Sequence, residues 1–181
     1  MRVLAISGSL RSDSYNTELL RLAAAAAPAG VEVELYAGLK EIPPYDADDD
    51  LPGDQPLAVV ALKEAIADAD AVLFATPEYN SSIPGALKNA LDWVSRPLLE
   101  SPLRNVPVAV LSSSTGMFGG VWAQAELRRV LSAIGARTLE DAVTVAKAHE
   151  RLGDGGDETL EAELRAVLDA LGAAVAERVA A

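Results

Sequence analysis

Three segments of the chain are almost continuously apolar, at residues 3–7, 71–76 and 106–111. A run of this length without polar alternation is typical of a strand that is covered on both faces in a parallel sheet. Residues 31–36 instead alternate strictly between apolar and polar positions, so one face of this strand is expected to contact water at an edge of the sheet. A shorter fifth strand is predicted near residues 142–146.

Helical patterns separate the predicted strands, over about residues 14–27, 57–68, 86–94, 121–134 and 158–179. Strands that alternate with helices in this way predict one parallel sheet between two layers of helices. Because the second strand is predicted at an edge and the first, third and fourth in the centre, we expect the strand order 2-1-3-4-5 of the flavodoxin-like fold. The length fits a single three-layer α/β domain over residues 1–181.

Side chains near the helix ends predict further local features. Ser82 is expected to cap the third helix, with Pro84 in its first turn. Asp92 and Arg96 lie four residues apart, a spacing that predicts a surface ion pair. Asp157 is expected to cap the last helix.

Composition and charge exclude several classes of function. The net charge of −12 argues against nucleic acid or an anionic membrane as a partner, because both bind clustered Lys and Arg. No apolar run approaches the roughly 18–20 residues that span a bilayer, so no membrane segment is expected. The absence of cysteine excludes disulfides and thiolate catalysis, and it is consistent with a cytoplasmic protein. The acidic run at residues 46–50 is not expected to bind calcium, because Leu51 stands where a calcium loop requires glycine.

The segment after the first strand is rich in groups that bind anions. Residues 7–16 read Ser-Gly-Ser-Leu-Arg-Ser-Asp-Ser-Tyr-Asn and lead into the first helix. Their hydroxyls, the Arg11 guanidinium, the Asn16 amide and the N–H groups of the helix start can converge on one phosphate. A serine-rich turn that only caps the helix is the alternative, although a cap needs one hydroxyl and no cation. The chain contains neither a G-x-G-x-x-G nor a G-x-x-x-x-G-K-[ST] motif, so a single phosphomonoester such as that of FMN fits better than a dinucleotide.

Two further polar loops, residues 76–83 and 112–120, follow central strands and are expected at the same edge of the sheet. In the first of them, Pro77 stiffens the chain and Tyr79 offers an aromatic surface. The backbone N–H groups of residues 78–81 could bond to the carbonyls and nitrogens of a flat ring. An ordinary strand-to-helix turn would explain the same residue types.

These motifs resemble those of one known family. The motifs are Ser7 to Arg11 with Ser14 and Asn16, Pro77-Glu78-Tyr79-Asn80, and residues 82–93. Together they are similar to those of the NADPH-dependent FMN reductase family, which includes bacterial quinone, chromate and azo-dye reductases. The resemblance extends over roughly residues 1–175. It implies bound FMN, NADPH or NADH as co-substrate, and a homodimer or homotetramer with the flavin near the interface.

The resemblance also implies which residues hold the cofactor. It assigns the phosphate to Ser9, Arg11, Ser14 and Asn16, and the flavin ring to Pro77, Glu78, Tyr79 and Asn80. The third loop is less similar to that of the family, and it adds Ser113, Thr115 and Gly116.

The leading interpretation is an enzyme that transfers hydride from NAD(P)H through FMN to a quinone-like or other small two-electron acceptor. Three alternatives stay open: a reductase that supplies free reduced FMN, a flavodoxin-like electron carrier, and a partner domain without a cofactor. Glu78 is expected to have a structural role, because hydride transfer through a flavin needs no protein base at the reacting atom. His149 is expected at the surface, and Trp93 and Trp122 in packing or at an interface.

Overall fold

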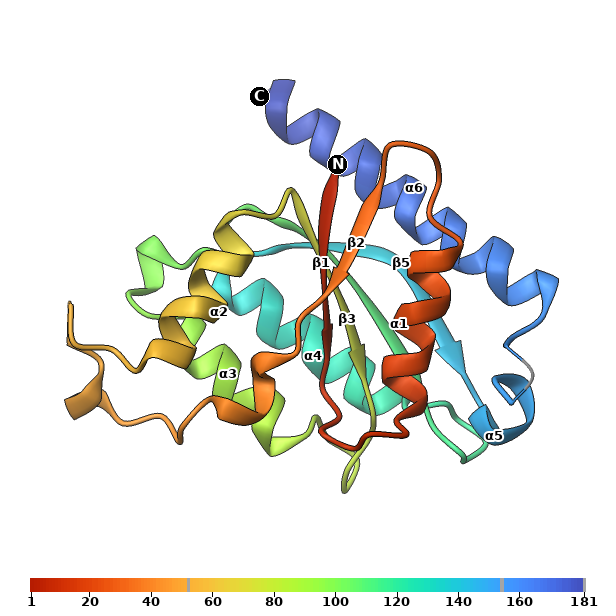
Figure 1. Ribbon diagram of the computed structural model, residues 1–181, viewed down its shortest axis with the longest axis horizontal. Helices are drawn as coiled ribbons and strands as arrows, with labels where there is room; N and C mark the ends of the chain where they lie inside the picture. Colours follow the sequence, from red (N-terminus) through yellow and green to blue (C-terminus); the bar gives the residue numbers. More distant parts are fainter. Residues whose placement is uncertain (52, 154, 181) are drawn as a thin grey trace.

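A sheet of five parallel strands forms the centre of the protein, shown in Figure 1. The computed structural model describes residues 1–51, 53–153 and 155–180. The strands lie in the order β2 (Glu32–Leu35), β1 (Arg2–Ser7), β3 (Ala71–Thr76), β4 (Pro107–Ser113) and β5 (Arg137–Val145). The predicted fold class and the order 2-1-3-4-5 are confirmed.

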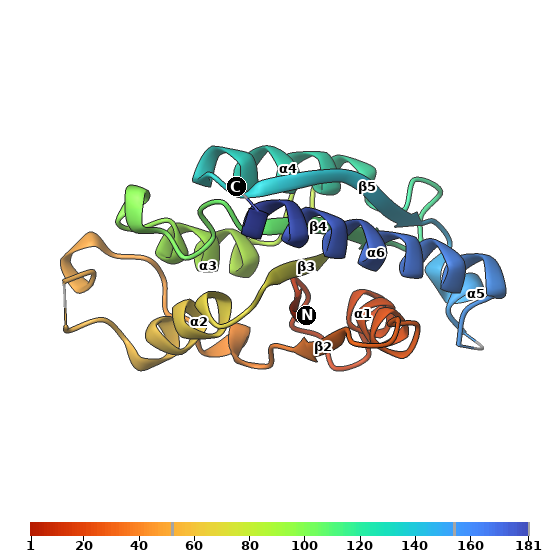
Figure 2. The same cartoon turned by 90° about the horizontal axis from the view of Figure 1, so that it is seen from above.

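Helices cover both faces of the sheet, as Figures 1 and 2 show. One face packs against α1 (Tyr15–Ala25) and α6 (Glu158–Ala180), with the short α5 (Ala148–Arg151) nearby. The other face packs against α2 (Leu57–Ala67), α3 (Gly85–Val94) and α4 (Val121–Ile134). The described residues also form three short 3₁₀ helices, η1 (Gly38–Glu41), η2 (Ala47–Asp49) and η3 (Leu98–Glu100). Within the described ranges, no helix combines the length and apolar character needed to cross a membrane.

Alternate residues of each central strand enter different cores. In β1, Val3 and Ala5 pack with α1 and α6, whereas Leu4 and Ile6 pack with the α2–α4 layer. This double burial explains the continuous apolar runs, because a strand covered on both faces has no position for a solvated side chain. The edge strand β2 keeps the predicted alternation of more exposed and less exposed residues.

The fifth strand is longer than predicted and begins at Arg137. Its pairing with β4 is irregular, because Val108 pairs with Thr138 while Val110 pairs with Ala142. The extra residues of β5 form a bulge that includes the exposed Glu140 and Asp141. Charges and bulges are common on edge strands, where one side of the backbone is unpaired. Because Glu140 and Asp141 interrupt the apolar pattern, the first half of β5 could not be identified from the sequence.

The predictions for the helix ends had mixed outcomes. Ser82 is not the cap of α3, because Pro84 occupies the N-cap position and provides no side-chain hydrogen bond. Asp92 pairs with Lys88, four residues before it, and not with the predicted Arg96, four residues after it; the distance from Lys88 Nζ to Asp92 Oδ1 is 2.7 Å. The Asp157 cap of α6 is confirmed, since the Leu160 N–H donates to Oδ1 at 2.7 Å, and this bond is the main cause that lowers the pKa of the Asp157 carboxyl.

The acidic segment before α2 is partly engaged with the protein. The Asp46 carboxylate accepts the Asp48 N–H at 3.0 Å and so caps η2. The Asp50 side chain is only 11% exposed and lies 3.9 Å from the Lys63 ammonium. No group of three or more His, Cys, Asp or Glu that could hold a metal ion occurs in the part of the chain that the structure describes.

The long segment between β2 and α2 is anchored on α3 near its middle. The Pro43 carbonyl accepts hydrogen bonds from Asn89 Nδ2 at 2.8 Å and from Trp93 Nε1 at 2.9 Å. The Tyr45 N–H donates to Asn89 Oδ1 at 2.8 Å, and the Tyr45 and Trp93 rings meet edge to face at 4.9 Å. Trp93 is fully buried, so its predicted role in packing is confirmed.

This anchor predicts a stability difference between neighbouring residues of α3. Asn89→Ala should lower the free energy of unfolding by about 1–3 kcal/mol, because it leaves the Tyr45 N–H without its acceptor and removes one donor to Pro43. Lys88→Ala removes an exposed ion pair and should cost only about 0.5 kcal/mol. Urea unfolding at one fixed protein concentration checks both values. Equal losses for the two variants would contradict the anchor.

Candidate functional site

Direct hydrogen bonds and close contacts join three loops at the carboxyl edge of the sheet. The loop after β1 contacts β3, since the Gly8 N–H donates to the Ala75 carbonyl at 2.8 Å. A Cβ atom on Gly8 would lie 2.9 Å from Leu87 Cδ2 of α3, so this loop approaches α3 as closely as a glycine allows. The loops after β1, β3 and β4 lie together at the lower edge of the sheet in Figure 1.

The first loop is organised around two serine hydroxyls. Ser7 Oγ accepts the Ser9 N–H at 3.3 Å and the Thr17 hydroxyl at 2.9 Å. Ser14 caps α1 by accepting the N–H groups of Asn16 at 3.2 Å and Thr17 at 3.4 Å. The predicted capping role and the predicted phosphate role thus fall on the same loop, because Ser14 remains able to donate its hydroxyl hydrogen.

Arg11 is exposed on this loop, and its guanidinium lies 5.5 Å from the centre of the Tyr15 ring. The ion pairs among the described residues do not include Arg11. In a chain with a net charge of −12, a guanidinium without an acidic partner beside a helix N-terminus is well placed to bind an anion.

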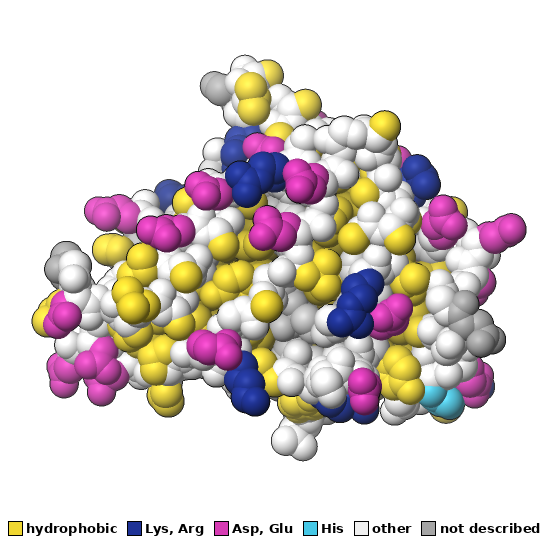
Figure 3. All heavy atoms as spheres, in the orientation of Figure 1, with side chains coloured by type: hydrophobic (Ala, Val, Ile, Leu, Met, Phe, Trp, Pro, Cys, Tyr) yellow, Lys and Arg dark blue, Asp and Glu magenta, His cyan; other side chains and the backbone are white. Residues whose placement is uncertain are grey.

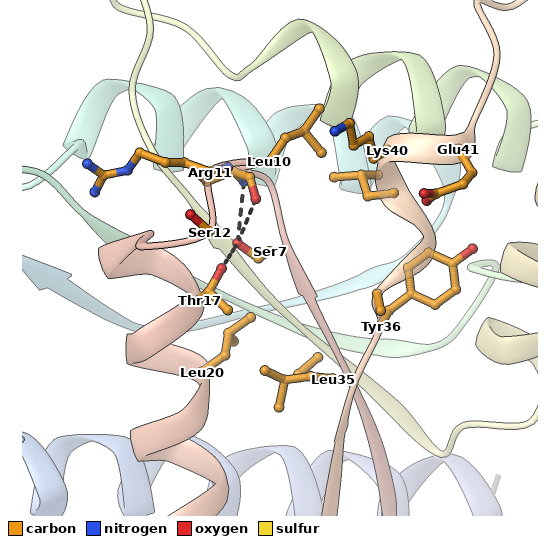
Figure 4. Close-up of a pocket in the computed structure, with 14 residues that line it drawn as sticks. Ser7, Leu10, Arg11, Ser12, Thr17, Leu20, Leu35, Tyr36, Lys40 and Glu41 are labelled. Carbon is orange, nitrogen blue, oxygen red and sulfur yellow. Dashed lines mark hydrogen bonds between the residues drawn. The ribbon is translucent and has the colours of Figure 1, made fainter.

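A cavity of about 270 Å³ lies beside the first loop, between that loop and the segment after β2 (Figure 4). Leu20 and Leu35 form part of its wall, and Tyr36 and Lys40 stand on the side opposite Ser7. Burial raises the pKa of the Tyr36 phenol, and Glu41 adds to this effect, so the phenol keeps its proton at neutral pH. In Figure 4 the Arg11 side chain points away from Tyr36 and Lys40.

Asn16 is buried and joins α1 to the end of β4. Its Nδ2 donates to the Ser113 carbonyl at 3.0 Å, and its Oδ1 accepts the Ser113 N–H at 2.9 Å. This pairing uses the carbonyl and one N–H of the amide. Asn16 is only 3% exposed, so a contact from its second N–H to a phosphate stays a prediction.

Among the buried side chains that the structure describes, Ser113 has a polar atom without a partner. Its Oγ is buried and makes no hydrogen bond within the described part of the protein. Ser113 ends β4, directly beside Asn16 and the start of α1. Buried hydroxyls are nearly always hydrogen-bonded, so this atom is a candidate contact for a bound group.

The second loop is a rigid turn. The Tyr79 N–H donates to the Ser82 carbonyl at 3.0 Å, and the Ser82 N–H donates to the Tyr79 carbonyl at 3.1 Å. Asn80 and Ser81 between them have φ values of 53° and 61°, as in the tight turns of β-hairpins. Tyr79 is 52% exposed, as expected for a ring contact, but its N–H is used within the turn, so the prediction that this N–H bonds to a ligand is wrong.

Glu78 contacts the start of α4 through its side chain. Its Oε2 accepts the N–H groups of Trp122 at 3.1 Å and Ala123 at 3.2 Å. The expected structural role of Glu78 is confirmed, although its partners at the start of α4 could not be identified from the sequence, where Trp122 is 44 positions away.

The third loop is held against β5 and α5. Ser114 donates its N–H to the Val145 carbonyl at 3.1 Å, and Gly116 accepts the Lys147 N–H at 2.9 Å. Thr115 and Gly116 are exposed, so they remain available to a ligand.

The residues that position this loop were missed in the sequence. Gln124 Nε2 donates to the carbonyls of Val110 at 3.2 Å and Val143 at 3.1 Å, which joins β4 and β5 beneath the loop. Gly119 and Gly120 have φ values of 60° and 86° before α4. The glycine pair was the available signal, since two adjacent glycines before a helix indicate a backbone that other residues rarely adopt.

This surface has the chemistry of an anion and ring site. It offers hydroxyls, backbone N–H groups, one guanidinium and aromatic side chains. The unpartnered Ser113 hydroxyl and the exposed Arg11 both fit a group that brings acceptor atoms, as a flavin mononucleotide does.

Comparison with known proteins agrees with this chemistry. The family model for NADPH-dependent FMN reductase matches residues 1–150. The chain is 42% identical over 139 residues to a quinone reductase of Escherichia coli (strain K12), covering 77% of this chain and 73% of that one. It is 50% identical over 131 residues to an NAD(P)H-dependent FMN reductase of Pseudomonas aeruginosa, covering 72% of this chain and 69% of that protein.

A solved structure extends the similarity to almost the whole chain. The flavoenzyme NAD(P)H:(acceptor) oxidoreductase from Paracoccus denitrificans superposes with a TM-score of 0.85 at 34% identity, covering 98% of both chains. The fold, the donor-rich loops and these similarities lead to one conclusion: the chain belongs to the NADPH-dependent FMN reductase family.

Proposed function

We propose that this family member binds FMN across the three loops that follow β1, β3 and β4, and that it uses NAD(P)H to reduce a quinone or a similar small two-electron acceptor. The proposal rests on three groups at one edge of the sheet: the exposed Arg11 guanidinium, the N-terminus of α1, and the buried Ser113 hydroxyl, which has no partner among the described residues. Relatives named quinone reductase support the choice of acceptor.

The first loop would hold the phosphate. Ser9, Arg11 and Ser14 offer donors toward the start of α1, and Asn16 has one remaining N–H. The ring would lie along the second and third loops, against Pro77, Glu78, Tyr79, Asn80, Ser113, Thr115 and Gly116. Because the three loops are joined by hydrogen bonds, the ring site is largely formed before the ligand arrives, which limits the ordering cost of binding.

Bound FMN supplies two-electron chemistry, which couples oxidation of NAD(P)H to reduction of a quinone to its hydroquinone with uptake of one proton from water. The chain's own contribution is orientation. The rigid Tyr79–Ser82 turn and the start of α4 form fixed walls, so a nicotinamide and a flat acceptor can occupy the same place in succession.

Two alternative functions from the sequence analysis remain open to experiment. A reductase that releases reduced FMN would differ by losing the flavin readily. A flavodoxin-like carrier is less well supported, because the similarity to a Pseudomonas aeruginosa flavodoxin is 18% identity with a TM-score of 0.58, which shows a common fold alone.

We also propose a homodimer or homotetramer that works in the cytoplasm, where NAD(P)H is available, with residues 1–181 as one domain. Exposed leucines support association with a second copy. Leu57 and Leu99 are 86% and 75% exposed, and Figure 3 shows hydrophobic side chains gathered over the α2–α3 end of the molecule. Exposed apolar patches of this kind commonly mark protein interfaces.

A visible absorption spectrum tests the proposed function. The protein, mixed with FMN and desalted, should remain yellow, bleach on addition of NAD(P)H without oxygen, and regain its colour when a quinone is added. Loss of the flavin on the column would favour the free-FMN alternative. Retained flavin that NAD(P)H does not bleach would favour the electron carrier.

Arg11→Ala should weaken FMN binding by about 10- to 100-fold, the loss expected when one charge-assisted contact to a phosphate is removed. Titration of FMN-free protein by quenching of flavin fluorescence measures the dissociation constant. Arg21→Ala is the matched control, because Arg21 lies on α1 and pairs with Glu18 at 3.0 Å. A similar loss of affinity in both variants would contradict the role of Arg11.

Ser113→Ala should change stability and affinity in opposite directions. Without FMN the variant should be as stable as the wild type or slightly more so, because a buried unpartnered hydroxyl is removed. Its FMN dissociation constant should rise about threefold to tenfold through loss of one hydrogen bond.

Ser112→Ala provides the contrast to this variant. Ser112 Oγ accepts Gln124 Nε2 at 3.4 Å, so its removal should lower stability and leave FMN affinity nearly unchanged. Thermal unfolding without FMN and the same fluorescence titration measure the two quantities. A Ser113→Ala protein that loses stability but keeps its affinity would show that the hydroxyl does not face the ligand.

A further inference from the structure

The Glu78 carboxylate, on the second loop, caps helix α4, which follows the third loop. Helix α4 begins at Val121, and the residue before it, Gly120, has a φ of 86° and no side chain to cap the helix. The first N–H groups of a helix have no partner within the helix. Two of them, on Trp122 and Ala123, donate to Glu78 Oε2 at 3.1 and 3.2 Å. The negative charge also lies favourably at the positive end of the helix dipole.

The start of α4 is fixed from the opposite side as well. A Cβ atom on Gly119 would lie 2.6 Å from Thr144 Cγ2 and 2.8 Å from the Val145 carbonyl carbon, so the backbone there rests directly on β5. A Cβ atom on Gly120 would lie 3.7 Å from the Glu78 Cβ. The helix start is therefore held between β5 and Glu78.

An exposed aromatic pair stands on this fixed start. The Phe118 and Trp122 rings meet edge to face, with their centres 5.0 Å apart. Phe118 is 59% exposed and Trp122 is 51% exposed, so about half of each side chain is open to solvent. Large aromatic side chains left open beside a polar site usually mark a surface that binds something.

The position of the pair indicates what binds. It lies on the loop after β4, and the carboxylate that holds it belongs to the residue before Tyr79, which is 52% exposed on the second loop. Glu78 thus joins two loops that both present aromatic groups at the edge of the proposed ring site. Aromatic side chains stack on flat rings and have no comparable affinity for small inorganic anions.

We propose that Glu78 is a positioning residue that holds the Phe118–Trp122 pair as the docking surface for a flat aromatic acceptor such as a quinone. The inference deepens the proposed function and rests on it. The chain then discriminates among acceptors by ring stacking against α4, and Glu78 acts on the acceptor only through Trp122 and its helix.

The test compares two acceptors at saturating NAD(P)H in the FMN-loaded protein. Menadione is a flat quinone, whereas ferricyanide is an inorganic anion that needs no stacking. Trp122→Ala should lower kcat/KM for menadione about tenfold, the size expected from loss of one stacking contact, and leave kcat/KM for ferricyanide within about twofold. Glu78→Ala should lower the ratio of kcat/KM for menadione to kcat/KM for ferricyanide by a similar factor. Glu78→Gln should retain most of the menadione activity, because its amide oxygen still accepts both N–H groups.

Asp157→Ala is the matched control for loss of a helix cap. Asp157 also caps a helix with a carboxylate, at 2.7 Å from the Leu160 N–H, but it does so at α6. Its removal should leave the ratio of the two kcat/KM values as in the wild type. An equal change of this ratio in Glu78→Ala and Asp157→Ala would overturn the proposal, since the effect would then be general destabilisation.

Tryptophan fluorescence gives a second measure without turnover. Trp93 is fully buried, so quenching by acrylamide in the oxidised, FMN-loaded protein reports on Trp122. Menadione should protect Trp122 from acrylamide in the wild type and in Glu78→Gln, and protect it less in Glu78→Ala. Trp122→Phe removes the signal and provides the background.

Several outcomes would overturn the inference while the proposed function stands. Unchanged menadione kinetics in Glu78→Ala and Trp122→Ala would do so, as would an equal loss for both acceptors. A changed oligomeric state of Trp122→Ala in sedimentation, with unchanged menadione kinetics, would assign the pair to a second copy of the chain. A wild-type protein that neither retains FMN nor oxidises NAD(P)H would instead overturn the proposed function.

Discussion

The pairing of the buried Asn16 amide with the backbone of Ser113 is the constraint on which the site depends. Both hydrogen bonds, at 3.0 and 2.9 Å, lie in a region closed to water, where an unpaired amide would be costly. They fix the start of α1 relative to the end of β4. The groups of the first loop and the end of β4 are thereby placed relative to each other.

The net charge of the protein also means that an anionic cofactor must be bound by local groups. The protein carries a net charge of −12, yet its family binds a phosphorylated cofactor. The long-range field therefore opposes the ligand, and local groups must overcome it. Backbone N–H groups at a helix start and the Arg11 guanidinium act at hydrogen-bond distance, where screening by salt is least effective.

The sequence allowed the architecture to be predicted because each element has an unambiguous pattern. Continuous apolar runs gave the central strands, and the alternation in residues 31–36 gave the edge, which together determined the strand order. Less could be predicted for β5, where Glu140 and Asp141 occupy a bulge on an open edge. The three loops of the site were identified for the same topological reason, as they follow the carboxyl ends of parallel strands.

Individual contacts could not be predicted, because a side chain pairs with the groups that lie near it in the folded structure, and the sequence does not give these distances. The pairing of the Asn16 amide with Ser113, 97 positions away, had no signal in the sequence, and the contact of Asn16 with a phosphate stays a prediction. Asp92 pairs with Lys88 and not with Arg96, although both are four residues from it.

The double acceptor at Pro43 has a consequence for how this chain can vary. By accepting from both Asn89 and Trp93, this carbonyl divides the connection between β2 and α2 into two shorter closed loops. The entropy of closing a loop grows only slowly with its length, so residues added after Tyr45 would cost little free energy. Residues added between β2 and Pro43 would instead displace Leu39 and Ile42, which are buried in the core beneath α2 and α3. Insertions and deletions among homologous chains should therefore concentrate on the side of the acidic segment.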